Sequence, residues 1–408
     1  MNDYNLTYKQ TSTNPITFLF LVLPYGMSNG FISITLPFLL VHQGFSVAEV
    51  ASIIALGLSA NIWRFLWAPM TDLSLSLHKW YLIGISLCAS TLLLLCFIPL
   101  NISSMGVLTI TVFLSQIAAT LVLSPVGGFM AKTVAEERKG RAGGWFQAGN
   151  LGGMGLGGGA GIWLSSHLSY QTALVILSIV MISCSIALYF VSPVYAEKER
   201  TLIERFKIIA FDIRSLFRSP IAVFSMAIFI TPIGIGAASN LWSSDAIDWH
   251  VRADSVALIT GTLSAVVMVL GCVAGGWIAD KLGRWSAFFG AGTLMALITL
   301  VMSYSVYLPS AYKTGVLFYA FTIGVVNAAF SAIVLHVIGK GLASTKYALL
   351  SSVGNIPNVY MTALDGWLHD AYSIKIMLLG ETLLGLSFII ISLFALHQLR
   401  LKKIPETN

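Results

Sequence analysis

The stretch that decides the fold is the charged turn GWIADKLGR at residues 276–284. It separates two apolar runs, at about 255–279 and 286–308, and each is long enough to cross the roughly 30 Å hydrocarbon layer of a membrane as a helix. The remainder of the chain repeats this pattern of long apolar runs and short polar turns. We therefore predict an all-α membrane protein.

The composition supports this fold class. Of the 408 residues, 57% are hydrophobic and 10% are charged, and the mean hydropathy is +0.84. A soluble domain carries about 25% charged residues, so this composition excludes a cytosolic enzyme and a nucleic-acid-binding protein. We predict twelve transmembrane helices, at about 16–40, 47–68, 79–100, 106–131, 142–164, 170–192, 220–246, 255–279, 286–308, 313–338, 345–368 and 374–397.

The basic residues predict the orientation of these spans. If the N-terminus is cytoplasmic, 20 of the 23 Lys and Arg residues fall on the cytoplasmic side, and only Arg252, Lys313 and Lys375 fall outside. Both termini are then cytoplasmic. The same distribution explains the net charge of +6 without a nucleic-acid partner. We expect a monomeric, multi-pass protein of a bacterial inner membrane, with the lipid bilayer as its surroundings.

One long hydrophilic interruption divides the chain into two halves. Residues 193–219 separate an N-terminal half of six spans (1–192) from a C-terminal half of six spans (220–408). Within the interruption, apolar residues recur at helical spacing, which predicts an amphipathic helix on the cytoplasmic membrane surface. Two pseudo-symmetric halves are typical of secondary transporters, whose halves rock about a central site.

The turn at 276–284 resembles the loop signature of the major facilitator superfamily. The resemblance implies the twelve-helix fold of that family and a gating role for Asp280 and Arg284 on the cytoplasmic side. The corresponding loop of the first half carries Asp72 without the cation and glycine that usually follow. We expect both loops to act as latches between helices.

Five further stretches are similar to the AmpG-type branch of this superfamily, which includes muropeptide permeases, acetyl-CoA transporters and siderophore importers. The resemblance implies import of a polar, medium-sized solute, with protons as the expected coupling ion. The family's acidic residues in the fourth span are absent here, which leaves the substrate and the coupling route open. The five stretches are 23–26, 65–72, 136–138, 347–352 and 366–368.

Two other motifs have simpler interpretations. GMSNG at 26–30 matches the nucleophile elbow of hydrolases, but it lies inside a long apolar run without the required strand, so we predict no enzyme activity. Gly149, Gly153, Gly157 and Gly161 are four residues apart, which predicts close approach of a second helix. The four cysteines form no Cys-x-x-Cys pair, and we expect neither a metal nor a cofactor.

Polar residues in the middle of the spans are candidates for substrate binding, because an unpaired polar group is costly in hydrocarbon. In the superfamily plan, the first, fourth, seventh and tenth helices line the cavity and the second, fifth, eighth and eleventh lie beside them. We expect each candidate either to contact the solute or to form a hydrogen bond between two helices. They are Tyr25, Asn29, Gln116, Gln147, Asn150, Asn240, Asn327, Asn355 and Asn358. Such neutral groups suit a sugar, a peptide or a chelate.

Charged residues near or inside the spans are candidates for coupling or gating. We expect Arg64 to extend its charge to the cytoplasmic interface or to pair with Asp72 as a structural gate, with contact to an anionic solute as the alternative. Glu381 and Asp365 are the candidates for proton coupling, although we expect Asp245, Asp248 and Asp365 to be mostly solvated near outer helix ends. A non-transporting sensor, signalling through 193–219 or the C-terminal tail, is the alternative function.

Overall fold

The computed structural model describes residues 13–73, 75–134, 139–191, 214, 217–338 and 343–401, and every regular element in this part of the chain is helical. Among these residues, nine helices are long and apolar enough to cross a membrane. The other three predicted spans also coincide with helical segments. The predicted all-α fold class is therefore confirmed. Most of the predicted amphipathic helix at 193–219 lies outside the described residues.

The N-terminal half consists of helices that cross the bundle alternately in the two directions. Its elements are α1 (Thr17–Gly30), η1 (Phe31–Thr35), α2 (Leu36–His42), α3 (Val47–Leu73), α4 (Leu77–Leu94), η2 (Leu95–Phe97), η3 (Ile102–Ser104), α5 (Met105–Thr133), α6 (Lys139–Gly155), η5 (Leu156–Ala160), α7 (Gly161–His167), α8 (Tyr170–Ser183) and η6 (Cys184–Phe190).

The C-terminal half has the same alternating arrangement. Its elements are α10 (Pro220–Phe229), η7 (Ala237–Asn240), α11 (Trp242–Asp245), α12 (Ala253–Val256), η8 (Ala257–Leu263), α13 (Ser264–Leu282), α14 (Arg284–Ser303), α15 (Pro309–Ile338), α16 (Ala343–Ala371) and α17 (Ile374–Leu401).

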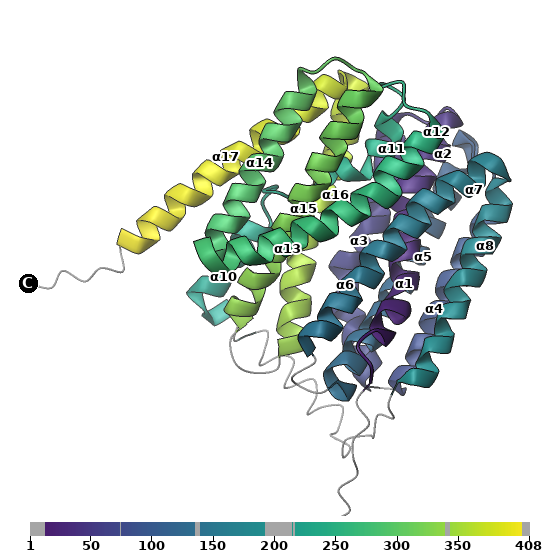
Figure 1. Ribbon diagram of the computed structural model, residues 1–408, viewed down its shortest axis with the longest axis horizontal. Helices are drawn as coiled ribbons and strands as arrows, with labels where there is room; N and C mark the ends of the chain where they lie inside the picture. Colours follow the sequence, from purple (N-terminus) through teal and green to yellow (C-terminus); the bar gives the residue numbers. More distant parts are fainter. Residues whose placement is uncertain are drawn as a thin grey trace, which may run out of the picture.

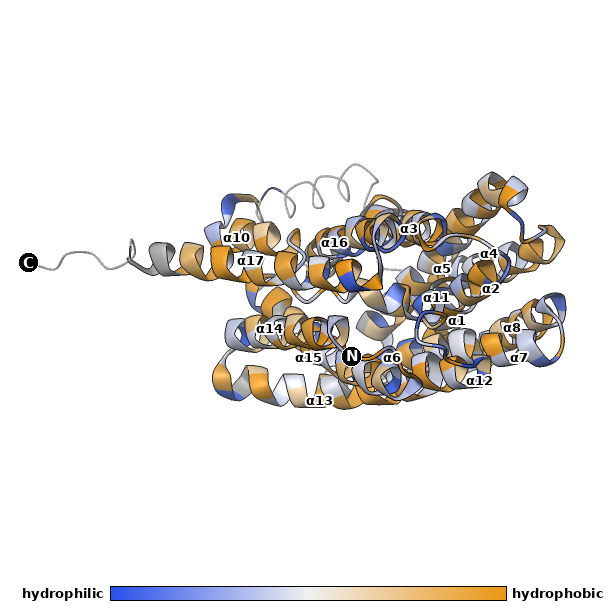
Figure 2. Cartoon of the chain, turned by 90° about the horizontal axis from the view of Figure 1, so that it is seen from above, coloured by the Kyte–Doolittle hydropathy of each residue, from blue (hydrophilic) through white to orange (hydrophobic). Residues whose placement is uncertain are grey.

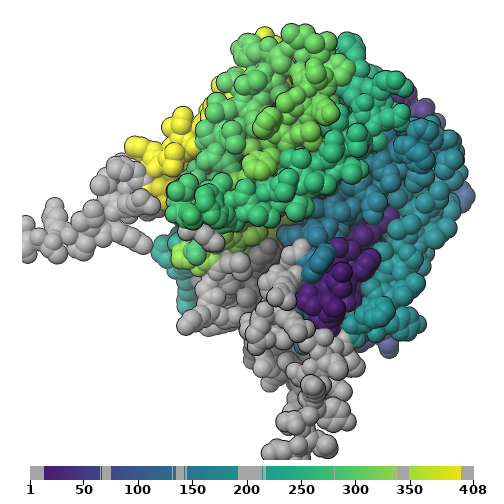
Figure 3. Space-filling model, in the orientation of Figure 1, coloured from purple at the N-terminus to yellow at the C-terminus, as the bar shows by residue number. Residues whose placement is uncertain are grey.

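The two halves lie side by side, with the purple and blue helices of the first half beside the green and yellow helices of the second (Figure 1). The space-filling view shows that they meet along an oblique boundary, where α13 lies against the first half (Figure 3). Hydrophobic residues predominate along most of the helices (Figure 2). Apolar side chains on the outside of the bundle, such as Val273 and Phe394, are exposed, as expected for a surface that faces lipid.

The predicted glycine stripe forms a close helix contact. Glycines of α6 and η5 pack directly on the backbone of α1, and a Cβ on Gly153 or Gly157 would overlap the carbonyl of Leu23 or Met27. Thr35 on η1 donates hydrogen bonds of 2.8 Å to the carbonyls of Gly157 and Gly158. Both η1 and η5 are π-helical, and this hydroxyl satisfies carbonyls near the distortion. The prediction of close approach is confirmed.

The seventh span, predicted as one continuous helix at 220–246, is interrupted in the structure. The structure interrupts it between α10 and η7, where Gly234 and Gly236 have φ angles of +64° and +74°. Pro232 lacks an amide hydrogen, and glycine tolerates positive φ, so the sequence around these residues favours the break. As a result α11 packs against α2 and α3 of the other half.

The bundle has two chemically different ends. The basic end, where α1 begins, carries the exposed residues Lys132, Arg218, Lys281 and Arg284. The acidic end, at the top of Figure 1, lies where α2 ends and α3 begins, and carries Glu49, Asp248 and Asp370. There the halves pack closely: a Cβ on Gly261 of η8 would overlap the backbone of Gly159 in η5, and one on Gly366 of α16 would overlap Ala51 of α3.

Candidate functional site

A small polar network lies in the core of the N-terminal half. The hydroxyl of Tyr25 on α1 donates a 3.1 Å hydrogen bond to Oδ1 of Asn61 on α3. Nε2 of Gln116 on α5 donates a 3.1 Å hydrogen bond to the hydroxyl of Ser28, which is enclosed in a helix. The predicted candidates Tyr25 and Gln116 therefore join helices within this half, and the setting of Ser28 agrees with the exclusion of a hydrolase elbow.

Two amide oxygens of the N-terminal half are buried without a partner, one in this network and one on the residue that follows Ser28. Oδ1 of Asn29 and Oε1 of Gln116 have no hydrogen-bond partner within the part of the chain that the structure describes. A buried, unpaired carbonyl costs about 1–3 kcal/mol, so each oxygen gains from a donor supplied by water or by a solute. Arg64 on α3 is half-buried and lies near enough to Tyr25 to act on it electrostatically, which places this cation beside the network.

A second amide network joins the interrupted seventh span to α16. Nδ2 of Asn240 donates hydrogen bonds of 2.9 Å to Oδ1 of Asn358 and to Oγ1 of Thr362. By contrast, Asn355 on the same helix donates to the carbonyl of Ser351, within its own helix. The structure thus brings the candidates Asn240 and Asn358 together and separates Asn355 from them.

The remaining amide candidates occupy other environments. The side chains of Gln147 on α6 and Asn327 on α15 are exposed, and Asn150 on α6 is half-buried. The backbone of Asn150 borders Gly26 of α1. These three residues form no side-chain hydrogen bond that ties them to either network in the described part of the chain.

Carboxyl groups from three helices are buried in the C-terminal half. Asp245 on α11 and Asp365 on α16 are fully buried, and Glu381 on α17 is 7% exposed. Tyr319 on α15 donates a hydrogen bond of 2.5 Å to Oε1 of Glu381. All the other oxygens of the three carboxyl groups lack a hydrogen-bond partner among the described residues. The groups are close enough to one another to interact electrostatically.

This burial corrects one prediction. Asp245 and Asp365 were expected to be mostly solvated, whereas the structure encloses both completely. The interruption of the seventh span explains the burial of Asp245, because it lets α11 pack against the N-terminal half. Asp248, in the following loop, keeps a side chain that is 33% exposed, so only this residue of the three retains substantial contact with solvent.

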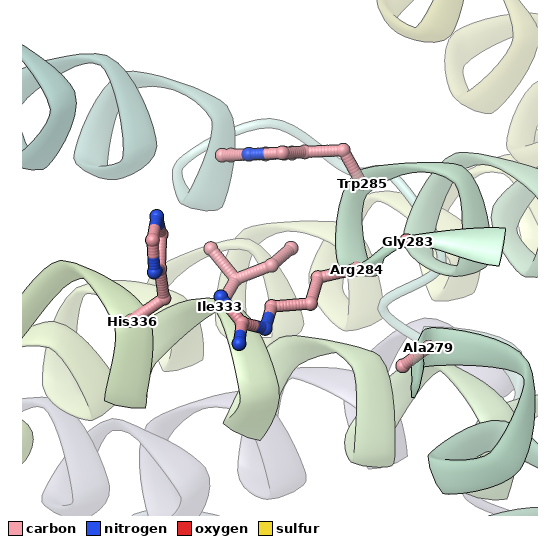
Figure 4. A pocket seen from close by; sticks show the side chains of 6 residues that line it. All are labelled: Ala279, Gly283, Arg284, Trp285, Ile333 and His336. Atoms are coloured by element: carbon pink, nitrogen blue, oxygen red, sulfur yellow. The ribbon is translucent and has the colours of Figure 1, made fainter. Parts of the chain in front are cut away.

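The predicted gating residues lie at the basic end. The structure describes the helical backbone at Asp72 and Asp280 but not the side chains of these two residues. Arg284 lines a pocket of about 330 Å³ together with Trp285, Ile333 and His336. Figure 4 shows the Arg284 side chain extending past Ile333 toward His336, with the Trp285 indole on the opposite wall. His336 lies near the end of α15, whereas Tyr319, which contacts the carboxyl group of Glu381, lies in the first half of that helix.

A group of residues at the acidic end was missed by the sequence analysis. The ring nitrogens of His369 lie 2.9 Å from Oδ2 of Asp248 and 3.0 Å from Oδ1 of Asp370. The two oxygens of Asp370 accept hydrogen bonds of 3.2 Å and 2.7 Å from the backbone N–H groups of Val47 and Ala48. These amides belong to the first turn of α3, so the contact joins the two halves. The sequence offers no signal for it, because the partners are more than 320 residues apart.

The charge state of this group follows from its geometry. His369 contacts a carboxylate through each nitrogen, and an imidazole can donate at both positions only when it is protonated. Burial opposes this charge, but the hydrogen bond to Asp248 and its other carboxylate neighbours raise the pKa of His369 to about 9. Burial also opposes the charge of Asp370, but the Ala48 N–H, the Ser46 hydroxyl and the imidazole hold its pKa below the ordinary value. Both residues follow the predicted span at 345–368.

These observations define a class of protein. An apolar bundle of two helical halves that encloses amide and carboxyl groups is the architecture of a secondary transporter. The sequence matches the family model described as Major Facilitator Superfamily over residues 18–362. Because this match covers most of the chain, the protein belongs to the Major Facilitator Superfamily.

Solved structures support the same fold. A crystal structure of a mutant of the nucleoside transporter NupG has a TM-score of 0.67 and 13% identity, and the alignment covers 93% of this chain and 98% of that chain. A crystal structure of a D-xylose-proton symporter has a TM-score of 0.73 and 14% identity, covering 93% and 96%. No curated protein matches the sequence.

The comparisons confirm the class of protein but not the branch of the superfamily. The family and both structural neighbours are transporters, so the prediction that the chain is a transporter and not an enzyme is confirmed. None of the matches separates the AmpG-type branch from the rest of the superfamily.

Proposed function

We propose that this transporter couples the movement of a polar, medium-sized solute to protons, by alternating between states open at opposite ends of the bundle. The observation that carries the proposal is the buried group of Asp245, Asp365 and Glu381, most of whose oxygens lack a hydrogen-bond partner among the described residues. An unpaired carboxylate is costly to bury, so taking up a proton stabilises such a group. A carboxyl group that is buried in one state and hydrated in the other can carry a proton across.

The solute is inferred from the amide networks. Asn29 and Gln116 offer unpaired amide oxygens, and Asn240 and Asn358 present a neutral amide pair. These groups suit a hydrogen-bonding solute of low charge. On the basis of the resemblance to the AmpG-type branch, we propose a muropeptide or a siderophore as the solute. The names of the structural neighbours add a nucleoside and D-xylose to the solutes worth testing.

The sidedness and organisation are also proposals. We place the basic end in the cytoplasm, with both termini on that side of a bacterial inner membrane, because Lys and Arg residues accumulate on the cytoplasmic side of membrane proteins. We propose that the halves at 1–192 and 220–408 move as two bodies in a monomer. The gating roles of Arg64, Asp72, Asp280 and Arg284 belong to the same proposal.

Coupling is tested by uptake into proteoliposomes with and without an imposed pH gradient. We expect Glu381→Gln and Asp365→Asn to abolish gradient-driven accumulation but to preserve exchange of solute. An amide imitates the protonated carboxyl, and exchange requires no deprotonation. Glu49→Gln is the matched control. Glu49 is a half-buried carboxylate at the start of α3 that is bonded within its own helix turn, so its replacement should leave accumulation unchanged. Accumulation at the wild-type level in both site variants would refute the coupling role.

The solute class is tested by thermal shift of the purified protein. The panel contains an anhydro-muropeptide, a ferric siderophore, acetyl-CoA, a nucleoside and D-xylose. A ligand present at 100 times its dissociation constant stabilises the folded state by about 2.7 kcal/mol, so a selective shift that increases with concentration identifies the class. Binding without uptake in proteoliposomes would favour the sensor.

A further inference from the structure

One contact at the acidic end joins the two halves through charge. The carboxylate of Asp370, at the end of α16, accepts hydrogen bonds from the N–H groups of Val47 and Ala48, at the start of α3. The first amides of a helix have no partner within the helix and carry a partial positive charge. A carboxylate from the C-terminal half thus supplies a cap for a helix of the N-terminal half.

This cap does not replace the local cap of α3. The N–H of Ser46 donates 2.8 Å to Oε2 of Glu49, and the N–H of Glu49 donates 3.2 Å to the hydroxyl of Ser46. This reciprocal pair is a capping box, and it satisfies two donors within the N-terminal half. The helix therefore begins at the same place without Asp370. The bonds from Val47 and Ala48 serve the contact between halves.

A cation holds the Asp370 carboxylate in position. Nδ1 of His369 lies 3.0 Å from Asp370, and its Nε2 lies 2.9 Å from Asp248 in the loop after α11. Among the described residues, the other ionisable groups around this site are Glu49 on α3, the buried Asp245, and three residues that line an adjoining depression of about 540 Å³, namely Tyr307, Tyr372 and Lys375. The imidazolium sits between carboxylates that would otherwise repel one another.

We propose that the bond from Asp370 to the first turn of α3 is a latch that keeps the acidic end closed, with His369 as its positioning residue. The inference rests on the proposed alternating movement of the two halves. Any movement that separates α16 from α3 at this end must break both bonds to Asp370. It must also part the contact between Gly366 and Ala51, one turn away on each helix.

The test measures distances between the halves by double electron–electron resonance in the full chain, without substrate and without a proton gradient. The four native cysteines are replaced by alanine. One spin-label pair, at the exposed positions Gln43 and Val306, reports the acidic end. A second pair, at the exposed Lys132 and Lys281, reports the basic end.

The wild-type protein should show a short distance at the acidic end. We expect Asp370→Ala to lower the ratio of closed to open molecules about tenfold or more, because two charge-assisted hydrogen bonds are lost. The distance at the basic end should shorten in the same molecules. Glu49→Gln is the matched control: it weakens the cap within α3 but leaves the bond between halves, so it should leave both distances unchanged.

The role of His369 has a separate readout. In the wild type, the closed population should fall as the pH rises from 7 to 10, because the imidazolium loses its proton. In His369→Ala the population should stay constant over that range. Unchanged distances in Asp370→Ala would overturn the latch, and so would a broadening at both ends, which indicates loosened halves. Since no solute is present, these outcomes are distinct from a failure of transport or coupling.

Discussion

Replacing Asn240 by alanine should uncouple the interrupted seventh span from α16. The change removes two hydrogen bonds of 2.9 Å, to Asn358 and Thr362, at a side chain that is 6% exposed. Each net hydrogen bond contributes about 0.5–1.5 kcal/mol, so the expected loss of stability is about 2 kcal/mol. For a unit of about 190 residues, this lowers the midpoint of thermal unfolding by about 4–8 °C.

The assay is thermal unfolding of the detergent-purified protein, with Gln147→Ala as the matched control. Gln147 is an exposed amide and should cost less than about 0.5 kcal/mol. The double variant Asn240→Ala with Thr362→Val should lose less than the sum of the single variants, since both remove the same bond. Equal midpoints for Asn240→Ala and Gln147→Ala, or full additivity in the double variant, would refute the proposed role of this network.

Two further predictions concern packing and pH. Gly157→Ala should cost about 3 kcal/mol and reduce the yield of folded protein, because the added Cβ overlaps the carbonyl of Met27. Gly152→Ala is the control and should be tolerated, because a Cβ there meets nothing within 4 Å. Equal yields of the two variants would contradict the packing argument. The stabilisation from His369 should be complete below pH 6.5, its ordinary pKa, and should disappear as the pH rises through about 9. Thermal midpoints of wild type and His369→Ala across this range measure it, and a constant difference between them would contradict the linkage.

The sequence predicted those features that depend on local patterns. Apolar runs located the helices, and the four-residue spacing of Gly149, Gly153, Gly157 and Gly161 predicted a helix contact that the structure confirms. Glu381 and Asp365 stood out as acidic residues in or beside predicted spans, and both are buried. These features could be predicted because each depends on the sequence of a single helix and on its immediate environment.

Features that depend on tertiary position were not predictable. The burial of Asp245 depends on the break in the seventh span, which Pro232 and two glycines favour but which average hydropathy does not register. The capping box at Ser46 and Glu49 marks the start of a helix in the sequence. It does not reveal that Asp370 will reach that helix from the other half. Only the packing of α16 on α3 brings these groups together.

The placement of functional groups along α16 links the separate proposals. Asn358, Thr362, Asp365 and His369 follow one another at intervals of four, three and four residues, so they share one face of the helix. Asn358 and Thr362 accept hydrogen bonds from the interrupted seventh span. Asp365 contributes a buried carboxyl group, and His369 positions the latch. A rigid helix cannot move one of these groups without the others. Because the C-terminal half is proposed to move as one body, release of the latch carries Asp365 away from α3 together with the carboxyl groups on α11 and α17. It also parts α11 from α2 and α3, so opening of the acidic end changes the environment of the proton site.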